Sequence, residues 1–285
     1  MTNWGLYYAY ILLTFFINVL LSTSYLCKMN ITSQQLYEFL EEKASFYNNP
    51  EFIEKDPVSI PHLFTKKEDI EIAGFLAATL SWGQRVTIIN KSRELIVRMD
   101  NAPFDFVMNA SENDIGSLTS FVHRTFQGED CMYFIQALQQ IYRQHGGLES
   151  VFLKGYHVNQ SIKESISQFR EVFFSFDHLH RTRKHVPDPE KGSAAKRINM
   201  YLRWMVRNDA KGVDFGIWKS IKTSDLLCPL DLHSGNVARK LKLLERKHDD
   251  WQAVEELTGY LRLFDPVDPV KYDFALFGTG INEKI

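Results

Sequence analysis

Apolar side chains recur at helical spacing through most of residues 29–285. In the stretch 250–264, for example, Val254, Leu257 and Leu261 fall on one face of a helix with a period of 3.6 residues. No run alternates apolar and polar residues between Asn-Gly or Asp-Gly turns, which is the pattern of hairpin strands. The pattern therefore predicts an all-α protein.

Local signals mark where these helices begin and end. Thr32 is a good N-cap for a helix to about residue 46, and Gln35 occupies the capping-box position. The helix expected at 68–82 has no charged residue from Ile72 onward, so it should lie in the core. Further helices are expected at 85–99, 129–143, 158–176, 193–207, 231–244, 250–264 and 268–277, the last ended by Gly278 and Gly280.

The segment with the strongest loop character is 178–192, which contains three His, two Pro and many charges. It separates an N-terminal helical lobe, residues 29–177, from a C-terminal lobe, residues 178–285. A chain of 285 residues is long for one domain and short for two. We therefore expect one lobed unit or two tightly joined lobes.

Residues 1–28 differ from the rest, because no charged side chain precedes Lys28. The apolar run 4–26 is long enough to cross a membrane, but it lacks the basic start and cleavage site of a secretory signal. Either Met29 is the true start and the leader is a wrongly extended reading frame, or the leader is a membrane anchor. We favour the first interpretation and a cytoplasmic protein, since nothing downstream indicates export.

Composition and motifs limit the cofactors that the chain could bind. The chain is 45% hydrophobic and 24% charged, as in ordinary globular proteins. Cys27, Cys131 and Cys228 are odd in number and far apart, which favours a reducing compartment and argues against a zinc ribbon or iron–sulfur cluster. No Walker or G-x-G-x-x-G motif is present. We therefore expect no metal, no nucleotide and no other cofactor, and we expect a monomer.

Charge is unevenly distributed along the chain. The net charge is −2, yet 181–207 contains eight Lys or Arg against two acidic residues, a local charge of +6. The stretch 239–247 contains five against one, a local charge of +4. One basic region in an acidic body is typical of a phosphate-binding face. The alternative is a solvated helix face.

Lys196 and Asp231 are the main candidates for chemistry. Lys196 follows the small residues 192–195, and with Ser193 as the helix cap it would lie one turn inside a helix. Partial desolvation there would lower its pKa and make the neutral amine a nucleophile. Asp231 precedes an amphipathic helix, where an N-cap carboxylate stays charged and can take a proton or stabilise a sugar cation. The alternatives are a surface lysine and a purely structural cap.

Other polar residues occur at predicted helix junctions. Gln84 and Arg85 follow the core helix, and Gln84 would read a base edge or simply form a turn. His123 and Arg124 would contact a base or tie loops together. Three aromatic residues could either stack on a base or pack in the core: Trp82, Phe126 and Trp204. We take as candidates for a base pocket Gln84, Arg85, His123, Arg124 and Trp204.

Three blocks of the C-terminal part resemble the core of helix-hairpin-helix DNA glycosylases, with the archaeal 8-oxoguanine glycosylase branch as the nearest. They are 196–207, 229–241 and 268–280. The chain from Met29 also resembles a bacterial family described only as a domain of unknown function. The glycosylase resemblance implies a two-lobed helical fold that binds DNA in a cleft and a base flipped into that cleft.

The resemblance also implies roles for individual residues. Lys196 would attack the sugar's anomeric carbon and form a Schiff base, and Asp231 would assist its deprotonation. The hairpin departs from the usual pattern, because only Gly192 remains and the lysine lies four residues on, so Lys191 is a rival nucleophile. Together with the basic stretches, the resemblance nominates as DNA contacts Gly192, Ser193, Arg197, Arg203, His233 and Arg239.

The sequence thus favours a base-excision DNA glycosylase with lyase activity on an oxidised purine such as 8-oxoguanine. A non-catalytic nucleic-acid-binding module on the same fold is the alternative, favoured by the altered hairpin and the acidic overall balance. A helical metal-dependent hydrolase would need a histidine constellation that the spacing does not provide.

Overall fold

A computed structural model describes residues 32–283, which fold into α-helices and short 3₁₀ helices and contain no strand; the longest connections flank α11, at 174–195 and 207–231. The all-α prediction is confirmed. The apolar leader 1–28 and the proposed start at Met29 lie outside the described residues. The first helices are α2 (Ser33–Tyr47), α3 (Pro50–Glu54), α4 (Lys67–Leu80), α5 (Arg85–Arg98), α6 (Pro103–Asn109), α7 (Glu112–Ser117) and α8 (Gly128–His145). They are followed by α9 (Leu148–Asn159), α10 (Ile162–Phe173), α11 (Lys196–Val206), α12 (Leu232–Lys240), α13 (Trp251–Phe264) and α14 (Tyr272–Asn282).

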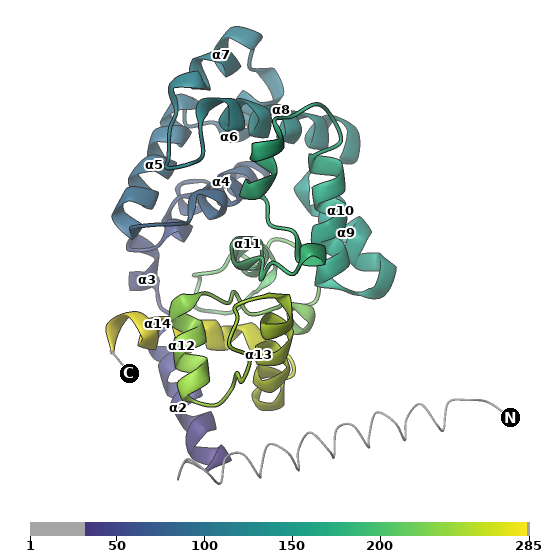
Figure 1. Cartoon of the computed structure of the whole chain (residues 1–285). Helices are drawn as coiled ribbons and strands as arrows, with labels where there is room; N and C mark the ends of the chain where they lie inside the picture. Colours follow the sequence, from purple (N-terminus) through teal and green to yellow (C-terminus); the bar gives the residue numbers. More distant parts are fainter. Residues whose placement is uncertain (1–31, 284–285) are drawn as a thin grey trace, which may run out of the picture.

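The helices form two groups with α11 between them (Figure 1). Helices α4 to α10 make one group, and α12, α13 and α14 make the other, together with the N-terminal helix α2. Gly278 of α14 lies against the Tyr47 ring, and Tyr47 donates a hydrogen bond to Glu283 at 2.6 Å. The structure therefore places α2 with the C-terminal helices, whereas the sequence assigned it to the lobe 29–177.

Helix α4 forms the centre of the larger group, because every residue from Ile70 to Leu80 is buried. The Phe75 ring packs on rings from α8, α10 and α11, and Gly74 lets Tyr201 of α11 approach closely. This packing fixes the position of α11 in the body. In the part of the chain that the structure describes, no helix is long and apolar enough to span a membrane.

Some predicted helix caps and ends agree with the structure, and others do not. Thr32 and Gln35 form the expected capping box. The helix expected at 158–176 is divided at Gln160, which is left-handed at φ 52°, and α10 begins after the cap Ser161. The expected stop at Gly278 and Gly280 is wrong, because α14 continues through both residues.

Candidate functional site

Lys196 is the first residue of α11 and does not lie one turn inside it. The helix begins after Ala195, whose backbone is left-handed at φ 47°, and Ser193 does not cap it as the sequence predicted. The Ser193 hydroxyl instead accepts a hydrogen bond from the Ala195 N–H at 3.3 Å. Residues 193–195 thus form a connection, and the lysine is the first side chain on the helix.

Asp231 is the N-cap of α12, as predicted. Its Oδ1 accepts hydrogen bonds from the backbone N–H groups of His233 at 2.9 Å and Ser234 at 3.0 Å. Its Oδ2 lies 3.6 Å from Lys196 Nζ, and the two side chains are 21% and 25% exposed. The cap fixes the carboxylate in one orientation beside the amine. At this separation a small side-chain movement suffices for proton transfer.

The Lys196–Asp231 pair lines a cavity of about 500 Å³, within the range of small-molecule sites. The Phe277 ring of α14 contacts several polar groups there, with Lys196 Nζ 5.8 Å and the Arg85 guanidinium 5.4 Å from its centre. The apolar and aromatic side chains that line the cavity come from several separate parts of the chain and are Phe52, Pro57, Trp82, Ile88, Met200, Phe277 and Ile281.

Two more carboxyl groups, Asp56 and Asp273, line the same cavity and are buried. Burial raises the pKa of Asp273 to about 6, against the opposing charge of Arg203. Burial also raises the pKa of Asp56 above its usual range. Arg203, predicted as a DNA contact, lines the cavity, and its guanidinium is buried between Asp273 and Asp214.

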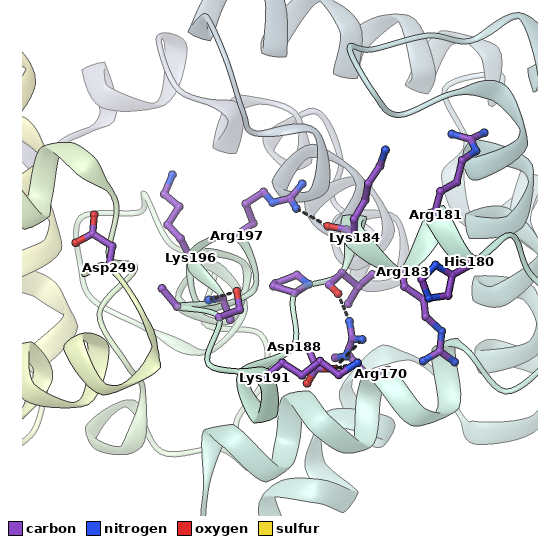
Figure 2. A pocket seen from close by; sticks show the side chains of 15 residues that line it. Arg170, His180, Arg181, Arg183, Lys184, Asp188, Lys191, Lys196, Arg197 and Asp249 are labelled. Carbon is purple, nitrogen blue, oxygen red and sulfur yellow. Dashed lines mark hydrogen bonds and ion pairs between the residues drawn. The ribbon is translucent and has the colours of Figure 1, made fainter. Parts of the chain in front are cut away.

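A groove of about 760 Å³ adjoins the cavity, and many residues of the basic stretch 181–207 line it (Figure 2). Lys196 lines both spaces, so the amine lies where they meet. Asp188 and Asp249 are the acidic groups in the groove lining. Its basic lining residues are Arg170, His180, Arg181, Arg183, Lys184, Lys191, Lys196 and Arg197.

Most of these cations belong to residues 180–191, which we call the basic strap. The strap consists of two short 3₁₀ turns, His180–His185 and Pro189–Lys191. It is held to α8 by the buried Asp130, which accepts hydrogen bonds from Arg181 at 2.7 Å and Thr182 at 2.6 Å. Burial by itself would raise the pKa of Asp130, but hydrogen bonds from His185 and Thr182 hold it at about 2. The predicted lobe-dividing loop is therefore an anchored element.

The other predicted DNA contacts occupy different environments. Gly192 is left-handed at φ 83°, and its carbonyl accepts a hydrogen bond from the backbone N–H of Trp251 at 3.0 Å. Arg197 donates to the carbonyl of Thr79, and Arg239 is held by Asp249. His233 lines the cavity. Lys191, the rival nucleophile, has a 79% exposed side chain in the groove and does not line the cavity.

The predicted base-pocket residues do not lie together. Arg85 lines the cavity, whereas Gln84 is exposed at the N-cap of α5. His123 is buried edge-on against Trp82, and the Arg124 guanidinium lies 4.7 Å over that same ring. Trp82, in turn, lines the cavity.

Trp204, the remaining base-pocket candidate, lies in the core and outside the cavity. Its side chain is 0% exposed on the core side of α11 and is absent from the cavity lining.

Sequence reasoning missed Phe52, Asp56, Asp273 and Phe277. Asp273 carried a signal, because it is a lone acidic residue in the apolar stretch 272–278. An acidic residue in such a stretch is buried only with a partner, which here is Arg203. Asp56 gave no such signal, since an Asp before a proline is an ordinary turn residue.

Comparison with known proteins places the chain in a family. No curated protein and no solved structure shows significant similarity to it. The family described as "Protein of unknown function (DUF2400)" matches residues 56–282, from Asp56 at the cavity to the last turn of α14. The matched region therefore contains the basic strap and the Lys196–Asp231 pair. The chain belongs to this DUF2400 family.

Proposed function

We propose that this protein is a DNA glycosylase with lyase activity, with Lys196 as its nucleophile. The observation that carries the proposal is the position of the Lys196 amine, 3.6 Å from Asp231, at the junction of the cavity and the basic groove. A flipped nucleotide needs this arrangement, because its base enters a pocket while its phosphates remain in a cationic groove.

The side chains present supply the groups that the reaction requires. Asp231 accepts a proton from Lys196, and the neutral amine attacks the anomeric carbon of the sugar. As the new carbon–nitrogen bond forms, the glycosidic bond breaks, and its electron pair leaves with the base, which takes up a proton. Sugar ring opening gives the Schiff base. Loss of a proton from the adjacent sugar carbon then expels the 3′ phosphate, and water releases the lysine.

The arrangement of α10, the basic strap and α11 supports a helix-hairpin-helix interpretation of the fold. Gly192 provides the left-handed turn before α11, and the nucleophile begins that helix. The strap takes the place of a short hairpin between the two helices, which accounts for the loss of the usual glycine pattern. We propose an oxidised purine such as 8-oxoguanine as the substrate, since the aromatic and carboxyl groups of the cavity suit a planar base with N–H donors.

Borohydride trapping tests the proposal. The full chain is incubated with duplex DNA that contains 8-oxoguanine, uracil or an abasic site, and borohydride is then added. We expect a covalent protein–DNA complex on a denaturing gel with wild type and none with Lys196→Gln. The Lys191→Gln variant should still be trapped, because Lys191 lies away from Asp231.

Binding measurements on the same variants separate the alternatives. Lys196→Gln should retain most of its DNA affinity, since the other groove cations remain. If wild type binds DNA but is never trapped, the protein is a nucleic-acid-binding module in which Lys196 and Asp231 form a structural ion pair. Loss of both trapping and binding in wild type would refute the nucleic-acid interpretation.

A further inference from the structure

Asp56 is a buried acidic residue of the cavity to which the proposed reaction gives no role. It precedes the 3₁₀ turn Pro57–Ser59 and is only 5% exposed. Its Oδ1 accepts a hydrogen bond from the Val58 N–H at 3.1 Å. Among residues 32–283, no hydrogen bond or ion pair reaches its Oδ2. One oxygen of this carboxyl group is therefore available to a molecule in the cavity.

The surroundings of Asp56 favour a role as a hydrogen-bond acceptor. Burial raises the pKa of Asp56, and the positive charges of Arg203, Arg85 and Lys196 oppose that rise by favouring the ionised form. None of these three cations forms an ion pair with it in the described part of the chain. A capping role alone needs only one side-chain oxygen and does not account for the second oxygen in the cavity.

We propose that Asp56 is a specificity-determining residue that accepts a hydrogen bond from a ring N–H of the extruded base. This inference rests on the proposed glycosylase function. The carboxylate selects bases that carry an N–H group beside a carbonyl group, because Arg85 lines the same cavity and can donate to that carbonyl. Guanine has one such edge, and oxidation at its 8 position adds a second, at the imidazole ring.

Asp56→Asn tests this role with little change in structure. Asn has nearly the same shape and is as good an N-cap as Asp, so its side-chain oxygen keeps the Val58 hydrogen bond. The group that faces the base changes from an acceptor to an NH₂ donor. Urea unfolding establishes that the variant is folded. If Asp56→Asn does not fold, Asp56→Ser keeps a capping oxygen and removes the carboxylate in the same way.

The measurement compares two substrates in one sequence context. Excision of 8-oxoguanine under single-turnover conditions should fall by roughly 10- to 100-fold, the cost of an unpaired polar contact in a buried site. Schiff-base trapping on an abasic site should keep its rate, because that substrate has no base to contact. An equal fall on both substrates would show that Asp56 only supports the fold, and unchanged excision would show that it does not touch the base.

The wild-type controls separate this inference from the proposal beneath it. If wild type excises 8-oxoguanine and Asp56→Asn does so equally well, only the role of Asp56 is refuted. If wild type neither excises a base nor is trapped on an abasic site, the glycosylase function fails and the role of Asp56 fails with it.

Discussion

At the residue scale, Gly83 controls the turn between α4 and α5 at the edge of the cavity. Its φ of 111° is rarely adopted by residues with a side chain, and a Cβ atom there would collide with the Arg124 guanidinium. Gly83→Ala should therefore displace Arg124 from the Trp82 ring. We expect the free energy of unfolding to fall by about 1–3 kcal/mol, as measured by urea unfolding followed by circular dichroism.

Gly259 provides the matched control for this substitution. It lies within α13, has an ordinary helical backbone and has open space where a Cβ would be placed. Gly259→Ala should raise the free energy of unfolding by about 0.5–1 kcal/mol, because alanine restricts the unfolded chain and favours the helix. If Gly83→Ala were also stabilising, the turn would not require its left-handed backbone.

Single residues were predicted well where the physical signal is local. Thr32 and Asp231 are caps whose partners lie within three residues, and both are confirmed. Trp82 and Trp204 could not be separated by sequence, since tryptophan suits both a core and a stacking site. Only packing shows that Trp82 lines the cavity and that Trp204 lies in the core.

At the scale of elements, Asp130 anchors the basic strap to α8. Its carboxylate is fully buried and accepts hydrogen bonds from Arg181, Thr182 and the Gln127 N–H. Asp130→Asn should lower the free energy of unfolding by about 2 kcal/mol at neutral pH. DNA affinity, measured by fluorescence anisotropy, should also fall, because the loosened strap presents its cations less regularly.

The pH dependence of the difference in unfolding free energy between wild type and Asp130→Asn tests whether the Asp130 carboxylate causes it. The pKa of Asp130 is lowered from 3.8 to about 2 in the folded protein, so its contribution is complete above about pH 4. The stability difference between wild type and Asp130→Asn should shrink as the pH falls toward 2. Glu129→Gln is the control, because Glu129 also pairs with Arg181 but is largely exposed. An equal loss in both variants would contradict the anchoring role.

Helices were easier to predict than the connections between them. The apolar pattern identified α2, α4, α5, α8 and α13 to within about two residues, since α4 is apolar on all sides and each of the others buries one face. The break at Gln160 was missed because its left-handed backbone belongs to a residue that usually continues a helix. The strap was expected to be a loop because its anchor, Asp130, lies about 50 residues earlier in the chain.

At the scale of the whole molecule, the candidate site exists only through tertiary packing. Three carboxyl groups line it: Asp56 caps η1 (Pro57–Ser59), Asp231 caps α12, and Asp273 belongs to α14. The amine is that of Lys196, the first residue of α11. Sequence selected Lys196 and Asp231 as candidates because both lie in blocks that resemble glycosylases, although it placed Lys196 one turn inside its helix and not at the start. Asp56 could not be placed with them, since nothing local indicates that residue 56 lies beside residue 196.

Charge is also organised at this scale, and salt dependence can test that organisation. The chain has a net charge of −2, so the proposed binding of DNA would depend on the cations of the groove and not on the overall charge. Lys184 of the strap is exposed and lines the groove (Figure 2). Replacing Lys184 by Ala should reduce the slope of log K against log salt by about one unit. Lys219→Ala removes an exposed lysine outside the groove and should leave the slope unchanged. Equal slopes for all three proteins would mean that phosphates bind elsewhere, and the amine of Lys196 would then have no DNA strand beside it.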